Sequence, residues 1–372
     1  MCMCRLFKKG IWFMKFKKNG FISCVLYYPA SVFALDLNVT PEEEVYNAVI
    51  NSGDIQNVHG GYVQDTLIYG GEQNVHSGVV RDTIIKSNYE HGSEGVQNVH
   101  GGSVIGTIIN GGSQSINGGS VTDTVISGGT QSIHGGSVTD TVISGGTQSI
   151  RGGSVTNTIM MSGSMQWVDD WGPGTSVTNT MLHNSEQKVS GGSVTNTTVY
   201  SGGEQSIRGG SVTNTTVHSG GLQIIFRGSV TNTDVYSGGV QSISGGSVTN
   251  TTVHSGGELI ISGGSVTNTT NMGYMSVNSG TVKNVDVSGQ NAHLTLLAEE
   301  WQESPVITGD ITVSDKGRIV LSYGVNSSDA DMTVNNGASL QLNNAGACTT
   351  NCLYTLNSLA LSGGSVALYN SP

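Results

Sequence analysis

A repeated sequence unit constrains the fold of this chain more than any other feature. Across residues 101–270 the same stretch, GGSVTNTTVYSGGEQSI in one of its copies, recurs with small changes. Its Ser-Val pair returns after 17, 17, 17, 22, 17, 18, 18, 18 and 18 residues, with the valine at Val104, Val121, Val138, Val155, Val177, Val194, Val212, Val230, Val248 and Val266. A fixed period in this range indicates a repeat protein, in which each unit packs on its neighbours.

The composition of the unit favours strands over helices. Each copy combines several glycines with Thr and Val and lacks apolar residues at helical spacing. Short β-rich runs, such as residues 205–207 and 215–217, are separated by Gly-Gly pairs that are typical of turns. We therefore expect an all-β fold: a single-stranded right-handed parallel β-helix, or β-solenoid, with one coil of 17–18 residues per unit.

Equivalent residues of successive coils should lie one above another at the inter-strand spacing of about 4.8 Å. Valines should stack on valines inside the solenoid, with Val212 between Val194 and Val230. Asn and Thr should form ladders of their own, and His218 should face outward to solvent. If the Thr-Asn-Thr triplets face outward, their regular hydroxyls would also suit an ice-binding surface; the alternative is a structural ladder.

The chain divides into four expected segments. Residues 1–34 are predicted to be a signal peptide, with Met14 as an alternative start, because a basic stretch at residues 14–18 precedes a short apolar run that ends in Val-Phe-Ala. Cleavage is expected after Ala34. Residues 35–50 should cap the first coil, residues 51–284 should form the repeat solenoid, and residues 285–372 should continue it with less regular coils.

Charge limits the possible partners. The 372-residue chain has a formal net charge of −11, and six of its 15 basic residues lie in the first 18 positions. Because the remaining chain is more acidic still, we expect no binding to nucleic acid. No catalytic triad, phosphate-binding loop or cysteine-rich metal motif is present, so we expect neither a cofactor nor an enzyme.

Two cysteines remain after the predicted signal peptide. Cys348 and Cys352 are close enough to form a disulfide if a tight turn lies between them, and the intervening Thr-Thr-Asn suits a turn. Free thiols or a weak metal pair are the alternatives, and an exported protein favours the disulfide.

Three groups of polar or aromatic residues are candidate sites. His59, His76, His100 and His134 share one repeat position, where Asn, Arg and Ser also occur; a solvent-facing turn and a metal site are both open. Tyr200, His218, Tyr236 and His254 form a second column, for which we expect aromatic stacking. Asp169 and Asp170 lie beside Trp167 and Trp171 in an insertion at 160–174, which we interpret as a loop rather than an acid–base pair.

The units across residues 51–284 resemble the passenger repeats of the AIDA-I and antigen 43 type of self-associating autotransporter adhesins, since residue type, order and period all agree. The resemblance implies right-handed β-helices displayed on the outer membrane of Gram-negative bacteria, where they promote adhesion, auto-aggregation and biofilm formation. It also implies a heptosyltransferase as a partner, with Ser201, Ser219, Ser237 and Ser255 as candidate sites of O-glycosylation.

The resemblance leaves one part of such proteins unaccounted for. The family ends in a translocating β-barrel, whereas this chain ends at Pro372. We therefore expect a passenger whose barrel is supplied elsewhere or missing. The chain should be exported through the inner membrane and should reach the cell surface if a barrel is available, and the periplasm otherwise.

The expected function is adhesive: the lateral faces should bind other copies or a host-cell receptor that the sequence does not identify. The alternative is a β-helical polysaccharide lyase or hydrolase, because such enzymes share this architecture. Only nine basic residues follow the signal peptide, and they are scattered along the chain.

Overall fold

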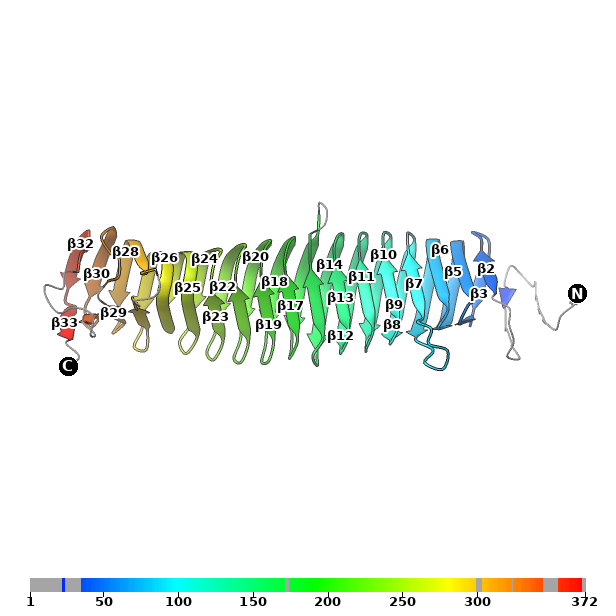
Figure 1. The fold of residues 1–372 in the computed structure, drawn as a ribbon, viewed down its shortest axis with the longest axis horizontal. Coiled ribbons are helices and arrows are strands. Elements are labelled where there is room, and N and C mark those ends of the chain that lie inside the picture. Colours follow the sequence, from blue (N-terminus) through cyan, green and yellow to red (C-terminus); the bar gives the residue numbers. More distant parts are fainter. Residues whose placement is uncertain are drawn as a thin grey trace, which may run out of the picture. The chain divides into compact units, whose positions relative to one another are not determined.

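The computed structural model describes residues 22–23, 35–170, 174–298, 303–322, 324–343 and 354–369. Within these residues the regular secondary structure consists of strands alone. A strand typically pairs in parallel with the next but one along the chain, as β10 (Ser120–Ile126) does with β12 (Ser137–Ser144) (Figure 1). This is the pairing of a chain that returns to the same face once per coil, and the predicted parallel β-solenoid is confirmed.

Each coil has three faces, which residues 113–129 illustrate. The first face is β9 (Ser113–Ile116), and β10 supplies the second and third faces on either side of Asp123. Buried and outward side chains alternate along both strands. The side-chain period of two therefore fixes which residues of the unit enter the core.

Three corners join these faces. A glycine corner (117–119) leads from the first face to the second, and a turn edge (127–129) leads from the third face to the next coil. Between the second and third faces the chain bends at Asp123, whose φ is 56°. In other coils this position holds Asn, with φ of 58° at Asn232 and 59° at Asn250. Asn and Asp are the side-chain-bearing residues that best tolerate this left-handed conformation, so we call this position the Asx corner.

The chain forms two compact units, residues 1–180 and 181–372. In the first unit, β1 (Ile22–Ser23) pairs with β3. The first-face strands are β2 (Asp36–Val39), β7 (Val96–Val99), β9, β11 (Thr130–Ile133), β13 (Thr147–Ile150) and β15 (Met165–Val168). The second and third faces are formed by β3 (Glu44–Tyr46), β4 (Val49–Asn51), β8 (Ser103–Asn110), β10, β12, β14 (Ser154–Met161) and β16 (Ser176–Leu182), the last of which ends two residues past the boundary at 180. By contrast, β5 (Ile55–Tyr69) and β6 (Glu72–Lys86) follow all three faces.

The second unit repeats this arrangement. Its first-face strands are β17 (Glu186–Val189), β19 (Glu204–Ile207), β21 (Leu222–Ile225), β23 (Val240–Ile243), β27 (His293–Leu296), β29 (Arg318–Ser322), β31 (Ser339–Asn343) and β33 (Ser365–Tyr369). Its other faces are formed by β18 (Ser193–Val199), β20 (Ser211–Val217), β22 (Ser229–Val235), β24 (Ser247–Val253), β28 (Val306–Ser314), β30 (Ala330–Asn335) and β32 (Ser358–Ser362), and β25 (Glu258–Asn271) and β26 (Tyr274–Ser288) follow all three faces.

Aliphatic columns fill the interior, one from each face. On the second face the valines of the repeated Ser-Val pair stack on each other: Val212 pairs with Val194 on one side and Val230 on the other. All three are fully buried. The expected inward position of this column is confirmed.

A ladder of buried glutamines runs beside the aliphatic columns, and the sequence analysis missed it. From Gln73 to Gln166 and from Gln205 to Gln241, the Nε2 of each glutamine donates to the Oε1 of the glutamine one coil earlier. For example, Gln223 donates to Gln205 at 2.7 Å, and Gln241 to Gln223 at 2.7 Å. Thr233 Oγ1 also donates to Gln223 Oε1 at 3.4 Å. A primary amide carries both donors and acceptors, so identical copies can satisfy each other in an apolar interior.

The two ends of the expected repeat region differ from its centre. Residues 35–51 form a coil of their own, because β2, β3 and β4 each pair with β5. After residue 285 the coils lengthen: Leu294, Ile319, Leu340 and Val366 occupy one column at intervals of 25, 21 and 26 residues. The longer coils keep the parallel register but not the repeated sequence.

Several predicted features fall outside the described residues: nearly all of the signal peptide, cleavage after Ala34, the Cys348–Cys352 disulfide, and Trp171. The part of the chain that is described contains no helix of sufficient length and apolarity to cross a membrane.

Candidate functional site

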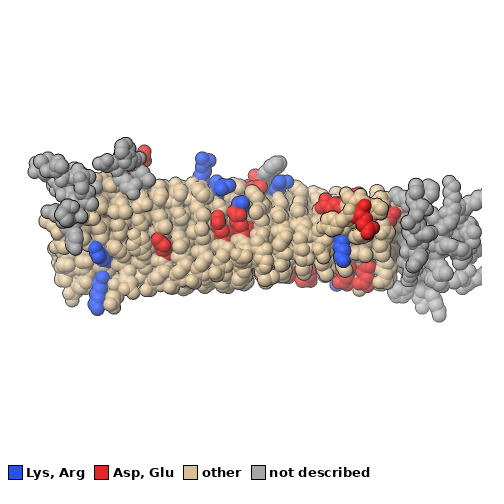
Figure 2. Space-filling model, turned by 60° about the horizontal axis from the view of Figure 1, so that its bottom comes forward, with Lys and Arg blue, Asp and Glu red and all other residues tan. Residues whose placement is uncertain are grey.

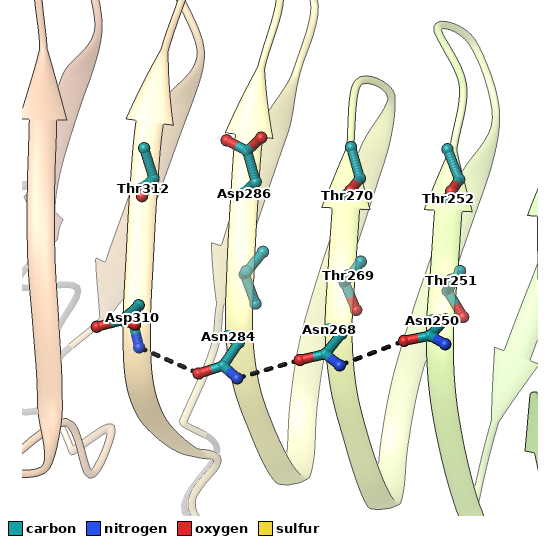
Figure 3. Close-up of a pocket in the computed structure, with 11 residues that line it drawn as sticks. Asn250, Thr251, Thr252, Asn268, Thr269, Thr270, Asn284, Asp286, Asp310 and Thr312 are labelled. Atoms are coloured by element: carbon teal, nitrogen blue, oxygen red, sulfur yellow. Dashed lines mark hydrogen bonds between the residues drawn. The ribbon is translucent and has the colours of Figure 1, made fainter. Parts of the chain in front are cut away.

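The outward side chains of the second unit form a polar groove along the Asx corner and the third face. Asn250, Asn268 and Asn284 line one side of this groove, and Thr252 and Thr270 line the other (Figure 3). The groove has a volume of about 350 Å³ and is also lined by Asp286, Asp310 and Thr312. Its walls therefore present amides, hydroxyls and two carboxylates.

Hydrogen bonds between coils hold the asparagine side of the groove in place. Asn268 Nδ2 donates to Asn250 Oδ1 at 3.2 Å, and Asn284 Nδ2 donates to Asn268 Oδ1 at 3.1 Å. At the end of the row the backbone N–H of Asp310 donates to Asn284 Oδ1 at 3.2 Å (Figure 3). Each amide in the row uses only part of its capacity of two N–H donors and two acceptor lone pairs. The fixed row can therefore form further hydrogen bonds outward, and the predicted asparagine ladder is confirmed.

The carboxylates of the groove lie at one end of it. Partial burial raises the pKa of Asp286, and the nearby carboxylate of Asp315 raises it further. The face shown in Figure 2 is sparsely charged: Lys, Arg, Asp and Glu side chains lie singly or in small groups, with wide uncharged areas between them. Among the residues that the structure describes, no three or more His, Cys, Asp or Glu side chains are grouped as a metal site would require. The groove is thus suited to hydrogen bonding with a polar surface.

Serines project from the turn edge of the second unit. In the turn at residues 200–203, Gly203 N–H donates to the carbonyl of Tyr200 at 2.8 Å, and Gly202 has a φ of 71°. This is a type II turn, which requires glycine at its third position and leaves the second position, Ser201, free to vary. Ser201, Ser219, Ser237 and Ser255 all occupy this second position and are exposed. Their modification remains a prediction.

The turns also stack on each other. Gly202 N–H donates to the carbonyl of Gly220 at 2.9 Å, and Gly220 N–H to that of Gly238 at 2.8 Å. A Cβ on Gly238 would lie only 2.6 Å from the Oγ of Ser219, so the serine of one coil covers the glycine of the next. The serines therefore form a continuous row, which we call the serine ridge.

An aromatic stack runs beside the serine ridge. The rings of His183, Tyr200, His218, Tyr236 and His254 stack in that order, with centroid separations of 4.2, 5.0, 5.3 and 4.3 Å. Stacking in this column is confirmed. His218 points outward as expected but is only partly exposed, because the two tyrosine rings cover its faces. His254 Nε2 lies 3.1 Å from Asp234 Oδ1.

The histidines of the first unit also stack. The rings of His59, His76 and His100 are exposed and nearly parallel, with centroids 4.8 and 5.1 Å apart. Stacked imidazoles direct their nitrogens along the ring planes and not toward a common point between the rings, so this geometry favours the solvent-facing turn over the metal site. Partial loss of solvation and the neighbouring imidazoles lower the pKa of His76.

The predicted insertion at 160–174 is shorter than expected. β14 extends to Met161, and β15 (Met165–Val168) pairs in register with β13, so Trp167 is a strand residue opposite Ser149. The additional residues follow Val168. Asp169 continues the ladder through its N–H, which donates to the carbonyl of Ile150 at 2.9 Å. The longer period therefore arises between β15 and β16 (Ser176–Leu182), outside the strand ladders.

Comparisons with known proteins bear on this surface. No protein-family profile matches the chain. The chain is 35% identical over 95 residues to the probable autotransporter YpjA of Escherichia coli (strain K12), a match that covers 25% of this chain and 6% of that protein. The chain therefore corresponds to only a small part of that relative.

A solved structure matches much more of the chain. It is the crystal structure of a TibA fragment, residues 55–350, that was hyper-glycosylated by TibC. The two share 34% sequence identity with a TM-score of 0.58, and the match covers 73% of this chain and 94% of the fragment. From the parallel solenoid, the repeated unit and these two relatives it follows that the chain belongs to the AIDA-I type of autotransporter passengers.

Proposed function

We propose that this chain is an exported adhesin passenger that binds other copies of itself or a host surface through the polar groove of its second unit. The observation that carries the proposal is the row of hydrogen-bonded asparagines, which holds partly unused amides at fixed positions on successive coils. Surface display is supported by the similarity to an autotransporter and to the TibA passenger fragment.

The repetition gives weak contacts a cumulative effect. A single exposed hydrogen bond contributes little net free energy, because it replaces bonds to water. Contacts repeated at every coil act together once the first has formed, since the others then become intramolecular. A partner with the same coil spacing, such as a second copy, can match the row over many coils.

The serine ridge is the proposed site of glycosylation. Ser201, Ser219, Ser237 and Ser255 are exposed at the second position of their turns. The turn conformation does not restrict the side chain at this position, so it would tolerate an attached sugar. The TibA fragment, which is similar to this chain, was glycosylated by TibC. We infer that a heptosyltransferase of this kind is the modifying partner.

Adhesion can be tested with cells that display the chain at their surface. The triple variant Asn250→Gly, Asn268→Gly and Asn284→Gly removes the amides and retains the left-handed backbone, since glycine adopts it freely and Gly309 already has a φ of 71°. Displaying cells should clump and settle faster than cells without the chain, and the variant should abolish the difference.

The matched control replaces three exposed serines on the second face of the same region, Ser229→Ala, Ser247→Ala and Ser265→Ala. Clumping should persist in this control. If the asparagine variant clumps and binds host cells as well as the unchanged chain, the groove is not the adhesive surface.

The enzymatic alternative receives no support from the groove. Asp286 and Asp310 are its two carboxylates, and its remaining lining residues are neutral. Incubation of the purified chain with acidic polysaccharides should release no new reducing ends; their release would favour a lyase or hydrolase instead.

A further inference from the structure

The third face of the first unit carries an exposed row of aliphatic side chains. Its members occupy one column, pair with each other from coil to coil, and are Val49, Leu67, Ile84, Ile108, Val125, Val142 and Ile159. Five of them are 36–41% exposed, and the other two are half-buried. We call this column the aliphatic row.

The second unit has a different composition at the same position. From β18 to β28 the column consists of Thr198, Thr216, Asp234, Thr252, Thr270, Asp286 and Thr312. The fold therefore accepts threonine or aspartate at this position. Stability does not require the aliphatic side chains of the first unit, and their exposure to water calls for a separate explanation.

We propose that the aliphatic row is an interface between two copies of this chain that lie side by side with their axes parallel and their amino-terminal ends together. The inference rests on the proposed function in one respect: surface display would bring the copies together. It concerns copies on one surface, whereas the polar groove is proposed to bind between surfaces.

A second copy is the partner that fits the row. The row is one residue wide and repeats at the coil spacing of about 4.8 Å. An extended peptide presents alternate side chains about 7 Å apart, so it falls out of step with the row after two coils. Another aliphatic row has the same spacing and stays in step along all seven coils.

The size of the face predicts a weak dimer. The third face is about 13 Å wide from the Asx corner to the turn edge, and seven coils extend about 34 Å along it. The contact would bury roughly 400 Å² of each copy, about half of a standard interface of 800 Å² per partner. Such a dimer forms mainly where copies are concentrated and already aligned, as they are when one membrane displays them.

Charge decides the relative orientation of the two copies. The Asx corner on one side of the row carries four exposed carboxylates, Asp65, Asp82, Asp123 and Asp140. The turn edge on the other side carries Asp54, which is buried, and then Lys86, Glu90 and Glu94; its residues at 69–71, 110–112, 127–129, 144–146 and 161–164 are uncharged.

In an antiparallel pair, with the two-fold axis across the row, the Asx corner of one copy would face the Asx corner of the other. Carboxylates would then oppose carboxylates. In a parallel pair, with the two-fold axis along the row, each Asx corner faces the turn edge of the other copy. Asp82 and Lys86 flank Ile84 on one coil, so in register each Asp82 would face Lys86 of the second copy.

Cysteine cross-linking of the full chain distinguishes these arrangements. A two-fold axis along the row brings every residue of the row opposite its own equivalent. In a background with the five native cysteines replaced by serine, Ile84→Cys, Val125→Cys and Ile159→Cys should each form disulfide-linked dimers under mild oxidation. The control is Ser120→Cys, an exposed position on the second face, which should cross-link at only the collisional rate.

A second variant tests the chemistry of the interface. Changing the uncrosslinked members of the row to threonine, as the second unit has them, should slow cross-linking through Val125→Cys by at least about tenfold. Circular dichroism should show that this variant is folded.

Two results would overturn the proposal. If none of the three cysteines cross-links faster than Ser120→Cys, the row is not an interface. In an antiparallel pair only the central residue of the row faces its own equivalent, so cross-linking of Ile108→Cys without the other three would show that the pair is antiparallel. Cross-linking is measured on the purified chain at a concentration high enough to populate a weak dimer, so its outcomes are independent of cell clumping, which tests the groove.

Discussion

The glutamine ladder has a direction, and the direction predicts unequal effects for one substitution at two equally buried positions. From Gln205 to Gln241 each Nε2 donates toward the preceding coil, and the column changes from Gln241 to Leu259 at its end. Gln223→Leu removes a central rung. It leaves the Nε2 of Gln241 and the Oγ1 of Thr233 without their acceptor, whereas Gln205 Oε1 still accepts from Thr215 at 3.2 Å.

Gln241→Leu removes the last rung and leaves no amide donor behind. Gln223 Oε1 still accepts from Thr233, and only Thr251 Oγ1, at 3.3 Å from Gln241 Oε1, loses its acceptor. A buried polar group without a partner costs about 1–3 kcal/mol. We therefore expect Gln223→Leu to destabilise its coils by about 2–4 kcal/mol and Gln241→Leu by about 1 kcal/mol.

Native-state hydrogen exchange on the full chain can measure both effects. The opening free energy of amides in β21 and β23 reports on the coils that contain the two glutamines, and urea unfolding provides an independent value. Equal losses for the two variants, or no loss for Gln223→Leu, would refute the directional ladder. The orphaned Nε2 of Gln56, which lies in the ladder's first rung, is a native example of the same asymmetry.

Three further outcomes are expected. Val212→Ala should lower the free energy of unfolding in urea by about 1–3 kcal/mol, because it leaves a cavity in a fully buried column. His218→Ala should lower it by less, but by more than a substitution at a fully exposed position, since the ring lies between two tyrosines. Equal losses for the two variants would contradict this order. Asn268→Ala should destabilise by about 1 kcal/mol more than Asn268→Gly, measured in the same way, because alanine is strained at a φ of 57°. The pKa of His76 is lowered in the folded chain, so the unfolded chain takes up the proton first and stability should fall as pH drops through about 6.5. His76→Asn should flatten the dependence of Tm on pH. An unchanged slope would exclude this residue as the cause.

The period of the sequence was sufficient to predict the coil and its inward valine column. Once the coil length is known, every residue has a defined neighbour one coil away, so the Asn ladder and the aromatic stack could also be predicted. The Asn or Asp that recurs at one repeat position also indicates a residue in the left-handed conformation. Only the φ values identify this position as the bend between the second and third faces.

The glutamine ladder was missed for a physical reason. An isolated Gln favours solvent, and only a column of identical amides satisfies its hydrogen bonds inside. Gln114, Gln131 and Gln148 recur at the repeat period, so the signal was present in the sequence, but polarity suggested the surface. The aliphatic row was missed because Val125 is apolar and apolarity suggested the core. The Asx corner at Asp123 shifts the in–out alternation by one residue, which buries Thr124 and Ile126 and exposes Val125.

The coils after residue 285 could not be predicted in register. Their lengths vary, and their ladders pair unlike residues, such as Thr295 with Val320, so no sequence period marks them. The insertion after Val168 was placed too early for a similar reason, because the Met and Trp residues of β15 replace the usual Thr and Ser without changing the strand.

The identical pairing of successive coils has a genetic consequence. Because Gln205, Gln223 and Gln241 present the same donor and acceptor to each neighbour at intervals of 18 residues, one coil can be removed or duplicated and the new neighbours still match. Nearly identical coding repeats are prone to unequal recombination, which removes or adds whole units. Each event would shorten or lengthen the passenger by about 4.8 Å without disturbing a ladder. The length of the solenoid can therefore change in single-coil steps while its fold remains the same.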